Sequence, residues 1–230
     1  MTITLEITDL IKSFPQPDGG SIQVLDIPRL VVNEGEQVAL IGQSGGGKTT
    51  LLHLIAGLLS ADGGSISVDG INLTKLSEQG RDRFRAHSIG YVFQTFNLLP
   101  AFTALENVRL GMTFGTGKTD NQRARELLNR VGLSERENYR PSQLSVGQQQ
   151  RVAIARAMAA KPRLLLADEP TANIDPKSAE SVLDLIGESC SNENIALLMV
   201  THDMQIASRF GRTDRLDEIN LAGPKSQSRH

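Results

Sequence analysis

The sequence lacks the residues that mark several classes of protein. Its 230 residues include one cysteine, no tryptophan and only 4% aromatic side chains. The lone cysteine, Cys190, excludes a disulfide scaffold, cannot build a zinc cluster and is typical of a reducing compartment. Neither charge dominates, because 24 lysine and arginine residues are matched by 26 aspartate and glutamate residues. Without a basic excess, we expect no nucleic-acid partner.

A long apolar run is also missing. The longest, residues 51–59, is interrupted by His53 and falls well short of the roughly 18 to 20 residues that a spanning helix needs. The N-terminal segment carries Glu6 and Asp9 where a secretory signal would be basic and then continuously apolar. We therefore expect no membrane span, no direct insertion into lipid and a cytoplasmic location, with any membrane role supplied by a partner.

What the chain does contain is an alternation of short β-branched runs and longer helical patterns, which is typical of an α/β protein. The expected strands are residues 3–10, 37–41, 65–68, 89–93, 164–167 and 195–200, and the expected helices are residues 104–111, 120–131 and 145–160. Nearly continuous apolar runs at 164–167 and 195–200 indicate parallel strands buried on both faces. Several Asp-Gly and Gly-Gly turns before residue 71 predict a small antiparallel layer beside that sheet.

The same patterns suggest how the chain is organised. With 39% hydrophobic and 22% charged residues, it can form one domain with its own core. We expect that single domain to span residues 1–230, with its core at about 1–93 and 162–215. A helical insertion is expected at about 95–160, and a polar C-terminal tail, broken by Gly223 and Pro224, at about 211–230.

The strongest local signal is the glycine-rich segment 42–49, GQSGGGKT, which matches the pattern G-x-x-x-x-G-K-[ST]. Glycines let successive main-chain N–H groups point at phosphate oxygens, and the N-terminus of the following helix adds positive potential. Lys48 supplies a point charge for the terminal phosphates, and the Thr49 hydroxyl can bind Mg²⁺. Because the segment follows an expected strand and precedes an apolar helix, we interpret it as a phosphate-binding loop.

Two further segments carry candidate chemistry. The expected strand at 164–167 ends in Asp168 and Glu169, which places Asp168 near Mg²⁺ and leaves Glu169 free to polarise a water. Segment 144–151, LSVGQQQR, leads into an alanine-rich helix with Ser145 as its N-cap, and its free N–H groups form a second anion site. Taken alone, the first segment could be a solvated turn and the second a capped helix; the phosphate-binding loop favours a function for the two carboxylates.

Together these segments resemble the ATPase subunit of an ABC transporter. Residues 42–49 resemble the family's Walker A loop, 164–169 its Walker B strand and 144–148 its LSGGQ signature. Gln94 occupies the place of the Q-loop glutamine, residues 172–175 resemble the D-loop, His202 resembles the switch histidine, and Phe14 sits where the family stacks an aromatic ring on adenine. These motifs follow the family's order over nearly the whole chain. Residues 97–100 and 103–108 look most like the LolD/MacB-type group, which includes lipoprotein-releasing ATPases.

The resemblance implies a P-loop NTPase fold with a RecA-like core sheet, a small antiparallel β layer and a helical subdomain. It implies ATP and Mg²⁺ as ligands, with Glu169 as the general base or the residue that orients the water, His202 at the γ-phosphate and Gln94 linking the metal to the helical insertion. It also implies a homodimer on ATP binding, in which the signature of one copy covers the ATP of the other. The implied nucleotide-binding residues are Phe14, Gly42, Gln43, Ser44, Gly45, Gly46, Gly47, Lys48, Thr49, Thr50, Ser145, Gly147, Gln148 and Asp175, and the implied metal ligands are Thr49, Gln94 and Asp168.

A membrane partner is implied as well. Residues 95–102 are unusually apolar for a connection that follows a strand. They could pack onto their own helices, but the resemblance suggests a groove for a helix of an integral membrane permease. The expected lining residues are Phe96, Leu98, Leu99 and Phe102. In that case the protein would be peripheral on the inner face of the cell membrane.

Two positions depart from the family pattern, and two other functions stay open. Val146 stands where glycine is usual, so either the backbone there is ordinary or closure on nucleotide is altered; Phe14 replaces a more frequent tyrosine. A soluble ABC ATPase acting on nucleic acid or ribosomes would be expected to carry a second cassette, a long coiled coil or a zinc module, for which this chain has no room. A non-hydrolysing regulatory module would be expected to lack Glu169 or His202. We expect no function for the other histidines, His53, His87 and His230.

Overall fold

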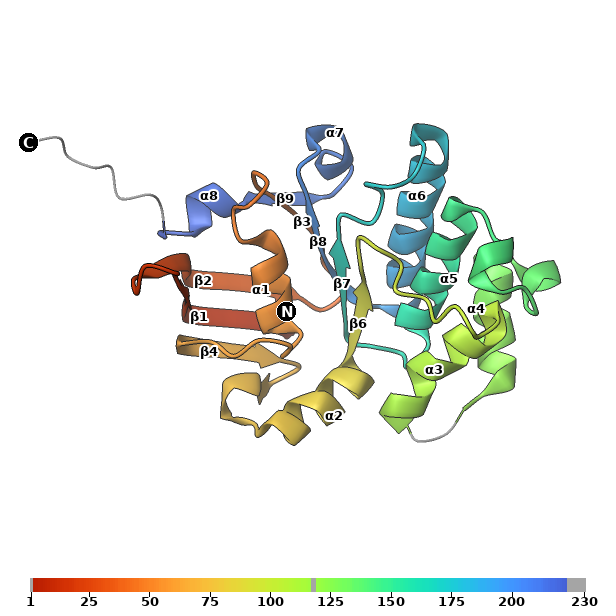
Figure 1. Ribbon diagram of the computed structural model, residues 1–230, viewed down its shortest axis with the longest axis horizontal. Coiled ribbons are helices and arrows are strands. Elements are labelled where there is room, and N and C mark those ends of the chain that lie inside the picture. Colours follow the sequence, from red (N-terminus) through yellow and green to blue (C-terminus); the bar gives the residue numbers. More distant parts are fainter. Residues whose placement is uncertain (1, 117–118, 223–230) are drawn as a thin grey trace, which may run out of the picture.

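The computed structural model describes residues 2–116 and 119–222 and contains two β-sheets (Figure 1). The antiparallel sheet has the strand order β2-β1-β4-β5, and the parallel sheet has the order β6-β7-β8-β3-β9. The antiparallel strands are β1 (Ile3–Pro15), β2 (Ser21–Asn33), β4 (Gly63–Val68) and β5 (Ile71–Asn72). The parallel strands are β3 (Gln37–Ile41), β6 (Ile89–Val92), β7 (Leu164–Asp168), β8 (Ala196–Thr201) and β9 (Arg212–Arg215). The α/β fold class predicted from the sequence is confirmed.

Helices cover both sides of the parallel sheet. In Figure 1, α1 and the antiparallel sheet lie on one side, and α3 to α6 lie on the other. The helices are α1 (Lys48–Ile55), α2 (Glu78–Ser88), α3 (Ala104–Thr116), α4 (Asn121–Arg130), α5 (Val146–Met158), α6 (Pro176–Glu193), α7 (Met204–Ala207) and α8 (Leu216–Ile219). Within the described ranges, no helix is both long enough and apolar enough to cross a bilayer.

Alternation along the central strands divides the interior into two cores. In β7, Leu164 and Leu166 join the core beneath α1, whereas Leu165 and Ala167 join the core formed with α3 to α6. Every residue of β7 and β8 is buried, which explains their nearly continuous apolar runs. Because these strands are parallel, their C-terminal ends lie at one edge of the sheet, where polar residues can gather.

The expected elements differ from the observed ones at the edges of the sheets and at α6, which was not among the expected helices. Residues 37–41 form β3 as predicted, and the N-caps expected for α4 and α5, Asp120 and Ser145, both accept a backbone hydrogen bond. The strands β2 and β9 were not predicted: β2 contains Pro28, β9 is the polar run RTDR, and both are edge strands, which tolerate such residues. Residues 212–219 of the expected tail thus form β9 and α8, while residues 223–230, including His230, lie outside the described part of the chain.

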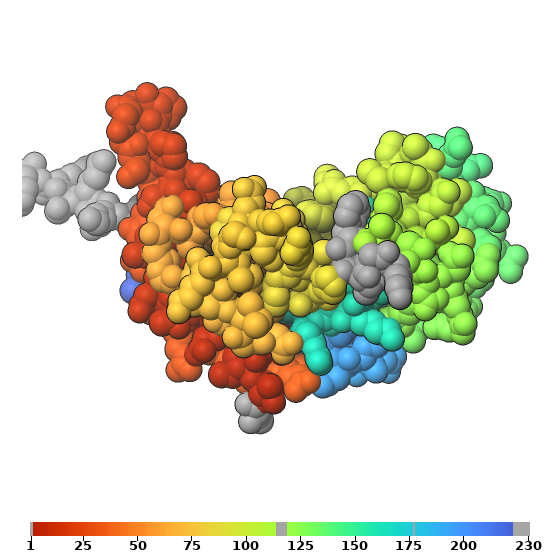
Figure 2. Space-filling model, turned by 90° about the horizontal axis from the view of Figure 1, so that it is seen from below, coloured from red at the N-terminus to blue at the C-terminus, as the bar shows by residue number. Residues whose placement is uncertain are grey.

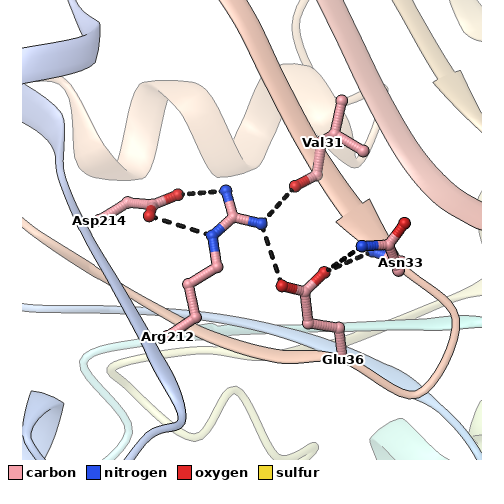
Figure 3. A network of polar contacts seen from close by, with 5 residues as sticks. All are labelled: Val31, Asn33, Glu36, Arg212 and Asp214. Atoms are coloured by element: carbon pink, nitrogen blue, oxygen red, sulfur yellow. Dashed lines mark hydrogen bonds and ion pairs between the residues drawn. The ribbon is translucent and has the colours of Figure 1, made fainter.

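A polar network at the edge strand ties the two sheets together (Figure 3). Arg212 of β9 donates through Nη1 to the Val31 carbonyl oxygen at 2.8 Å and to Glu36 Oε1 at 3.0 Å. Its Nε and Nη2 bind the two oxygens of Asp214 at 3.1 and 2.5 Å. Glu36 also accepts from the backbone and side-chain nitrogens of Asn33 at 2.7 and 2.9 Å. One guanidinium therefore joins β9 to the end of β2 and the turn into β3.

Replacing Arg212 by methionine should lower the free energy of unfolding by about 1–2 kcal/mol, because two carboxylates lose a partly buried partner. Burial alone would raise the pKa of Glu36, but hydrogen bonds from Asn33 and Arg212 outweigh it and hold that pKa below its usual range. A lowered folded-state pKa means that the contribution is complete above about pH 5 and lost as the pH falls below about 4. Urea unfolding at pH 7 and pH 3.5 measures both effects.

The matched control for this change is Arg209→Met, which removes an exposed ion pair with Asp184. It should change the free energy of unfolding by less than about 0.5 kcal/mol. Equal losses in the two variants, or a loss in Arg212→Met that persists undiminished at pH 3.5, would contradict the role given to the network.

Candidate active site

The glycine-rich loop connects the C-terminal end of β3 to the first turn of α1. Gly47, the residue before the helix, has φ 95°, and a Cβ atom there would lie 2.9 Å from Leu25 Cδ2, so only glycine fits. Lys48 is 6% exposed, and its Nζ donates to the carbonyl oxygens of Gly42 at 2.8 Å and Gln43 at 3.0 Å. The loop is thus curled around a buried ammonium group at the N-terminus of a helix, an arrangement that attracts anions.

A cavity of about 470 Å³ opens on this loop. It is lined by Phe14, Val24, Ser44, Gly45, Gly47, Lys48, Thr49, Thr50, Gln94 and Glu169. All of these were predicted from the sequence except Val24, which was missed because β2 was not recognised as a strand. At one wall, Lys12 Nζ lies 5.3 Å from the centre of the Phe14 ring, within the range of a cation–π contact.

Asp168 ends β7 and is 5% exposed. Burial raises the pKa of Asp168, while a hydrogen bond from the Thr49 hydroxyl opposes the rise. Among the described residues, the buried Asp168 Oδ1 has no hydrogen-bond partner. An unpartnered carboxylate oxygen beside a threonine hydroxyl is a donor set that suits a divalent cation, so the residues fit the Mg²⁺ expected from the sequence.

Glu169 lies between two cationic or proton-donating side chains. Its Oε1 is 3.5 Å from Lys48 Nζ, and its Oε2 is 2.9 Å from His202 Nδ1. Since a carboxylate only accepts, the imidazole donates from Nδ1. The backbone of Glu169 has φ 42°, a left-handed conformation that costs a non-glycine residue about 1–2 kcal/mol. Such strain at a polar, partly enclosed carboxylate is typical of a functional residue.

Gln94 follows β6 and lines the same cavity. The Asn173 side chain donates to the Gln94 carbonyl oxygen at 3.0 Å, which ties this loop to the segment after β7. The structure therefore brings Gln94, Glu169 and the glycine-rich loop together, with His202 bonded to Glu169.

The signature residues lie elsewhere. Ser145, Gly147 and Gln148 begin α5 and do not line the cavity. Ser145 Oγ accepts from the Gln148 backbone N–H at 3.3 Å, and Gln148 Oε1 accepts from the Ser145 backbone N–H at 3.0 Å, which forms a capping box. Val146 starts the helix with an ordinary helical backbone, without the positive φ that would require glycine. Of the two alternatives given for Val146, the ordinary backbone is therefore the one observed. Asp175 likewise caps α6, accepting from the Ser178 N–H at 3.0 Å, and does not line the cavity.

A groove of about 700 Å³ separates α2 from α3 (Figure 2). The groove is lined by residues of α2, of β6 and the connection after it, of α3, and of the end of α5. These are Asp82, Arg83, Arg85 and Ala86; Ile89, Gly90, Tyr91, Phe93, Asn97 and Leu99; Leu110 and Gly111; and Arg156, Ala157 and Ala160. Of the four expected lining residues, only Leu99 is among them. Leu98 instead packs against the core beside α3 to α6, because that strand-to-helix connection folds back onto its own helices.

A buried side chain of α3 helps to hold the conformation of this connection. Asn107 of α3 is fully buried; its Oδ1 accepts from the Leu99 N–H at 2.9 Å, and its Nδ2 donates to the carbonyl oxygens of Leu99, Phe102 and Thr103 at 3.0–3.2 Å. Leu99 and Phe102 stay exposed at 43% and 37%. The exposed apolar side chains are therefore displayed by a rigid support rather than by a loose loop.

Comparison with known proteins places these features in context. A family model described as ABC transporter matches residues 25–172. The ATP-binding cassette MJ0796, in a dimeric post-hydrolysis state bound to ADP and Pi, is 35% identical with a TM-score of 0.84, covering 92% of this chain and 93% of that chain. A second dimeric structure of MJ0796, described as a bacterial ABC transporter cassette, is 34% identical with a TM-score of 0.83, covering 92% of this chain and 94% of that chain.

Proposed function

This chain belongs to the ABC transporter family and is an ATPase, and on that premise we propose that it is the subunit that powers a membrane permease of LolD/MacB type. The observation that carries the proposal is the cavity that the glycine-rich loop, the buried Lys48 and Glu169 line together, with His202 bonded to Glu169. Such a cavity combines a phosphate site with a positioned base, as hydrolysis of a phosphoanhydride requires.

Binding of ATP would exchange the contacts of Lys48. In the structure, its ammonium group donates to the Gly42 and Gln43 carbonyl oxygens and faces Glu169 at 3.5 Å. Phosphate oxygens are stronger acceptors than these carbonyls, so Lys48 would turn toward the β- and γ-phosphates. The loop N–H groups and the positive end of α1 would hold the same phosphates. Phe14 would stack on the base.

Mg²⁺ would be held by Thr49, Gln94 and Asp168, and it would supply charge neutralisation for the phosphate oxygens. Hydrolysis itself would depend on Glu169. Once Lys48 turns to the phosphates, Glu169 Oε1 is free to take a proton from a water, while His202 keeps Oε2 in place. The water oxygen bonds to the γ-phosphorus as the bond to the ADP oxygen breaks.

A homodimer on ATP binding would complete the site. Ser145, Gly147 and Gln148 do not line the cavity of their own chain, so they are available to a second copy. The positive N-terminus of α5 would then neutralise the triphosphate from the opposite side, and Asp175 would lie near the interface. Both MJ0796 structures are dimers, which supports this arrangement for a chain of the same fold.

The groove between α2 and α3 would receive a helix of the permease and would place the protein on the inner face of the cell membrane. Its lining is mostly apolar but includes five charged or amide side chains, those of Asp82, Arg83, Arg85, Asn97 and Arg156. An apolar groove is a recurring site for an amphipathic helix. The LolD/MacB assignment, with lipoprotein release or export as the transported function, depends on the resemblance of residues 97–100 and 103–108.

Leu99→Cys should crosslink to a LolD/MacB-type permease when the two are co-expressed. Leu99 is 43% exposed in the groove, whereas the native Cys190 is fully buried, so the introduced thiol alone should react. A cysteine replacing Leu221, which is 65% exposed outside the groove, is the control. Equal crosslinking at both positions, or none at Leu99, would count against docking in the groove.

A further inference from the structure

Tyr91 stands between the groove and the cavity. It lies in β6 opposite Leu166 of β7, and Asp168 follows Leu166 by two residues on the same face of the sheet. A diagonal neighbour at this spacing is within reach of an aromatic side chain. The ring of Tyr91 stacks on Phe93 with centroids 4.1 Å apart and 23° between planes, and the ring of His53 from α1 lies 6.0 Å away.

The two ends of this side chain have different surroundings. Tyr91 and Phe93 both line the groove between α2 and α3. The hydroxyl end is buried and interacts with the Asp168 carboxylate. Yet among the described residues neither Tyr91 Oη nor Asp168 Oδ1 has a partner at full hydrogen-bond geometry. A buried donor and a buried acceptor, both without such a partner in the described part of the chain, therefore lie on the same face of the sheet.

We propose that Tyr91 is a positioning residue: its hydroxyl orients the Asp168 carboxylate, and its ring transmits occupation of the groove to that carboxylate. The ring is rigid, so a helix pressing on Tyr91 and Phe93 would move the hydroxyl with it. Partners that orient a metal-binding carboxylate typically change metal affinity by 10- to 100-fold when removed. That a permease helix occupies the groove rests on the proposed function; the link from Tyr91 to Asp168 does not.

The composition provides a selective probe, because the chain has two tyrosines, Tyr91 and Tyr139, and no tryptophan. Protein labelled with 3-fluorotyrosine should therefore give two ¹⁹F resonances, which Tyr91→Phe and Tyr139→Phe assign. Addition of Mg²⁺ with a non-hydrolysable ATP analogue should shift the Tyr91 resonance further than the analogue alone. Asp168→Asn should remove that extra shift. A Tyr91 resonance that does not respond to Mg²⁺ would overturn the first half of the proposal.

A binding measurement tests the same link without fluorine. Tyr91→Phe keeps the ring and removes only the hydroxyl, so the Mg²⁺ concentration that half-saturates analogue binding should rise by roughly 10- to 100-fold. Tyr139→Phe, the same chemical change at a side chain that lies 5.2 Å from the Arg136 guanidinium, should leave it unchanged. An unchanged value in a Tyr91→Phe protein with wild-type unfolding would overturn the proposal.

The second part of the proposal, that occupation of the groove is transmitted to Asp168, is tested by attaching a bulky group covalently inside the groove. Cys190 is buried, and burial raises its pKa to about 12, so a bulky maleimide should label only an introduced Leu99→Cys thiol. Labelling of Leu99→Cys should shift the Tyr91 resonance and change the Mg²⁺ concentration that half-saturates analogue binding at least twofold. The change in this Mg²⁺ concentration should vanish in the Leu99→Cys, Tyr91→Phe double variant. Labelled Leu221→Cys should behave like wild type. No response to the Leu99 label would overturn transmission. These labelling experiments use no permease. Failure of the crosslinking experiment would therefore contradict only the proposed docking of the permease, and not the link from Tyr91 to Asp168.

Discussion

Glu169→Gln is expected to reduce ATP turnover by about 10²- to 10³-fold while leaving ATP binding intact, because loss of a general base typically costs that much. Glutamine has nearly the same shape as glutamate, but its amide cannot take a proton from water. It would still face Lys48 and His202, which lie 3.5 and 2.9 Å from the carboxylate oxygens. Phosphate release assays at saturating Mg-ATP measure the loss.

The same variant should accumulate as an ATP-bound dimer. Hydrolysis removes the γ-phosphate contacts that hold the closed state, so a protein that binds ATP without cleaving it stays closed. Light scattering with and without ATP should show doubling of the mass in the variant. Glu188→Gln, a change to an exposed glutamate of α6, is the control and should match wild type in both assays. Wild-type turnover in Glu169→Gln would remove Glu169 from the mechanism.

Lys48→Met is expected to weaken ATP binding by at least 100-fold and to abolish measurable hydrolysis. The Lys48 side chain is 6% exposed, so its charge acts on bound phosphate with little screening by water. Charge-assisted hydrogen bonds contribute about 1.5–3 kcal/mol each, and two to a triphosphate account for the predicted loss. Calorimetric titration with Mg-ATP measures it.

The control for this change is Lys75→Met, which removes an exposed lysine outside the cavity. It should bind and hydrolyse ATP as wild type does. Because methionine leaves the Gly42 and Gln43 carbonyl oxygens without their donor, unfolding must be measured alongside binding. If a folded Lys48→Met protein binds ATP with wild-type affinity, the assignment of the glycine-rich loop as the phosphate site is wrong.

The two variants separate binding from chemistry. Lys48→Met should neither bind tightly nor dimerise, whereas Glu169→Gln should do both without turnover. If both variants lose ATP binding, Glu169 mainly supports the glycine-rich loop through its contact with Lys48 and does not act in the reaction.

Functional residues that lie close together in the sequence can be predicted from it. The loop from Gly42 to Thr49 and the pair Asp168 and Glu169 carry their chemistry in their spacing, because each is a strand end followed by a turn or helix start. The lining of the groove is harder to predict from the sequence. Its walls come from α2, β6, α3 and α5, and the sequence alone made Leu98 a lining residue although it packs inward.

The sequence by itself determined the strand–loop–helix unit around Lys48, the buried parallel strands and the α/β class, since these follow from local periodicity and from backbone conformations that glycine permits. Only the tertiary structure decided which distant residues meet: Val24 at the cavity, Arg212 between the sheets, and Tyr91 beside Asp168. Edge strands and side-chain contacts of this kind depend on packing across strands that are far apart in the chain. Local sequence patterns do not encode that packing, because many pairings satisfy them equally well.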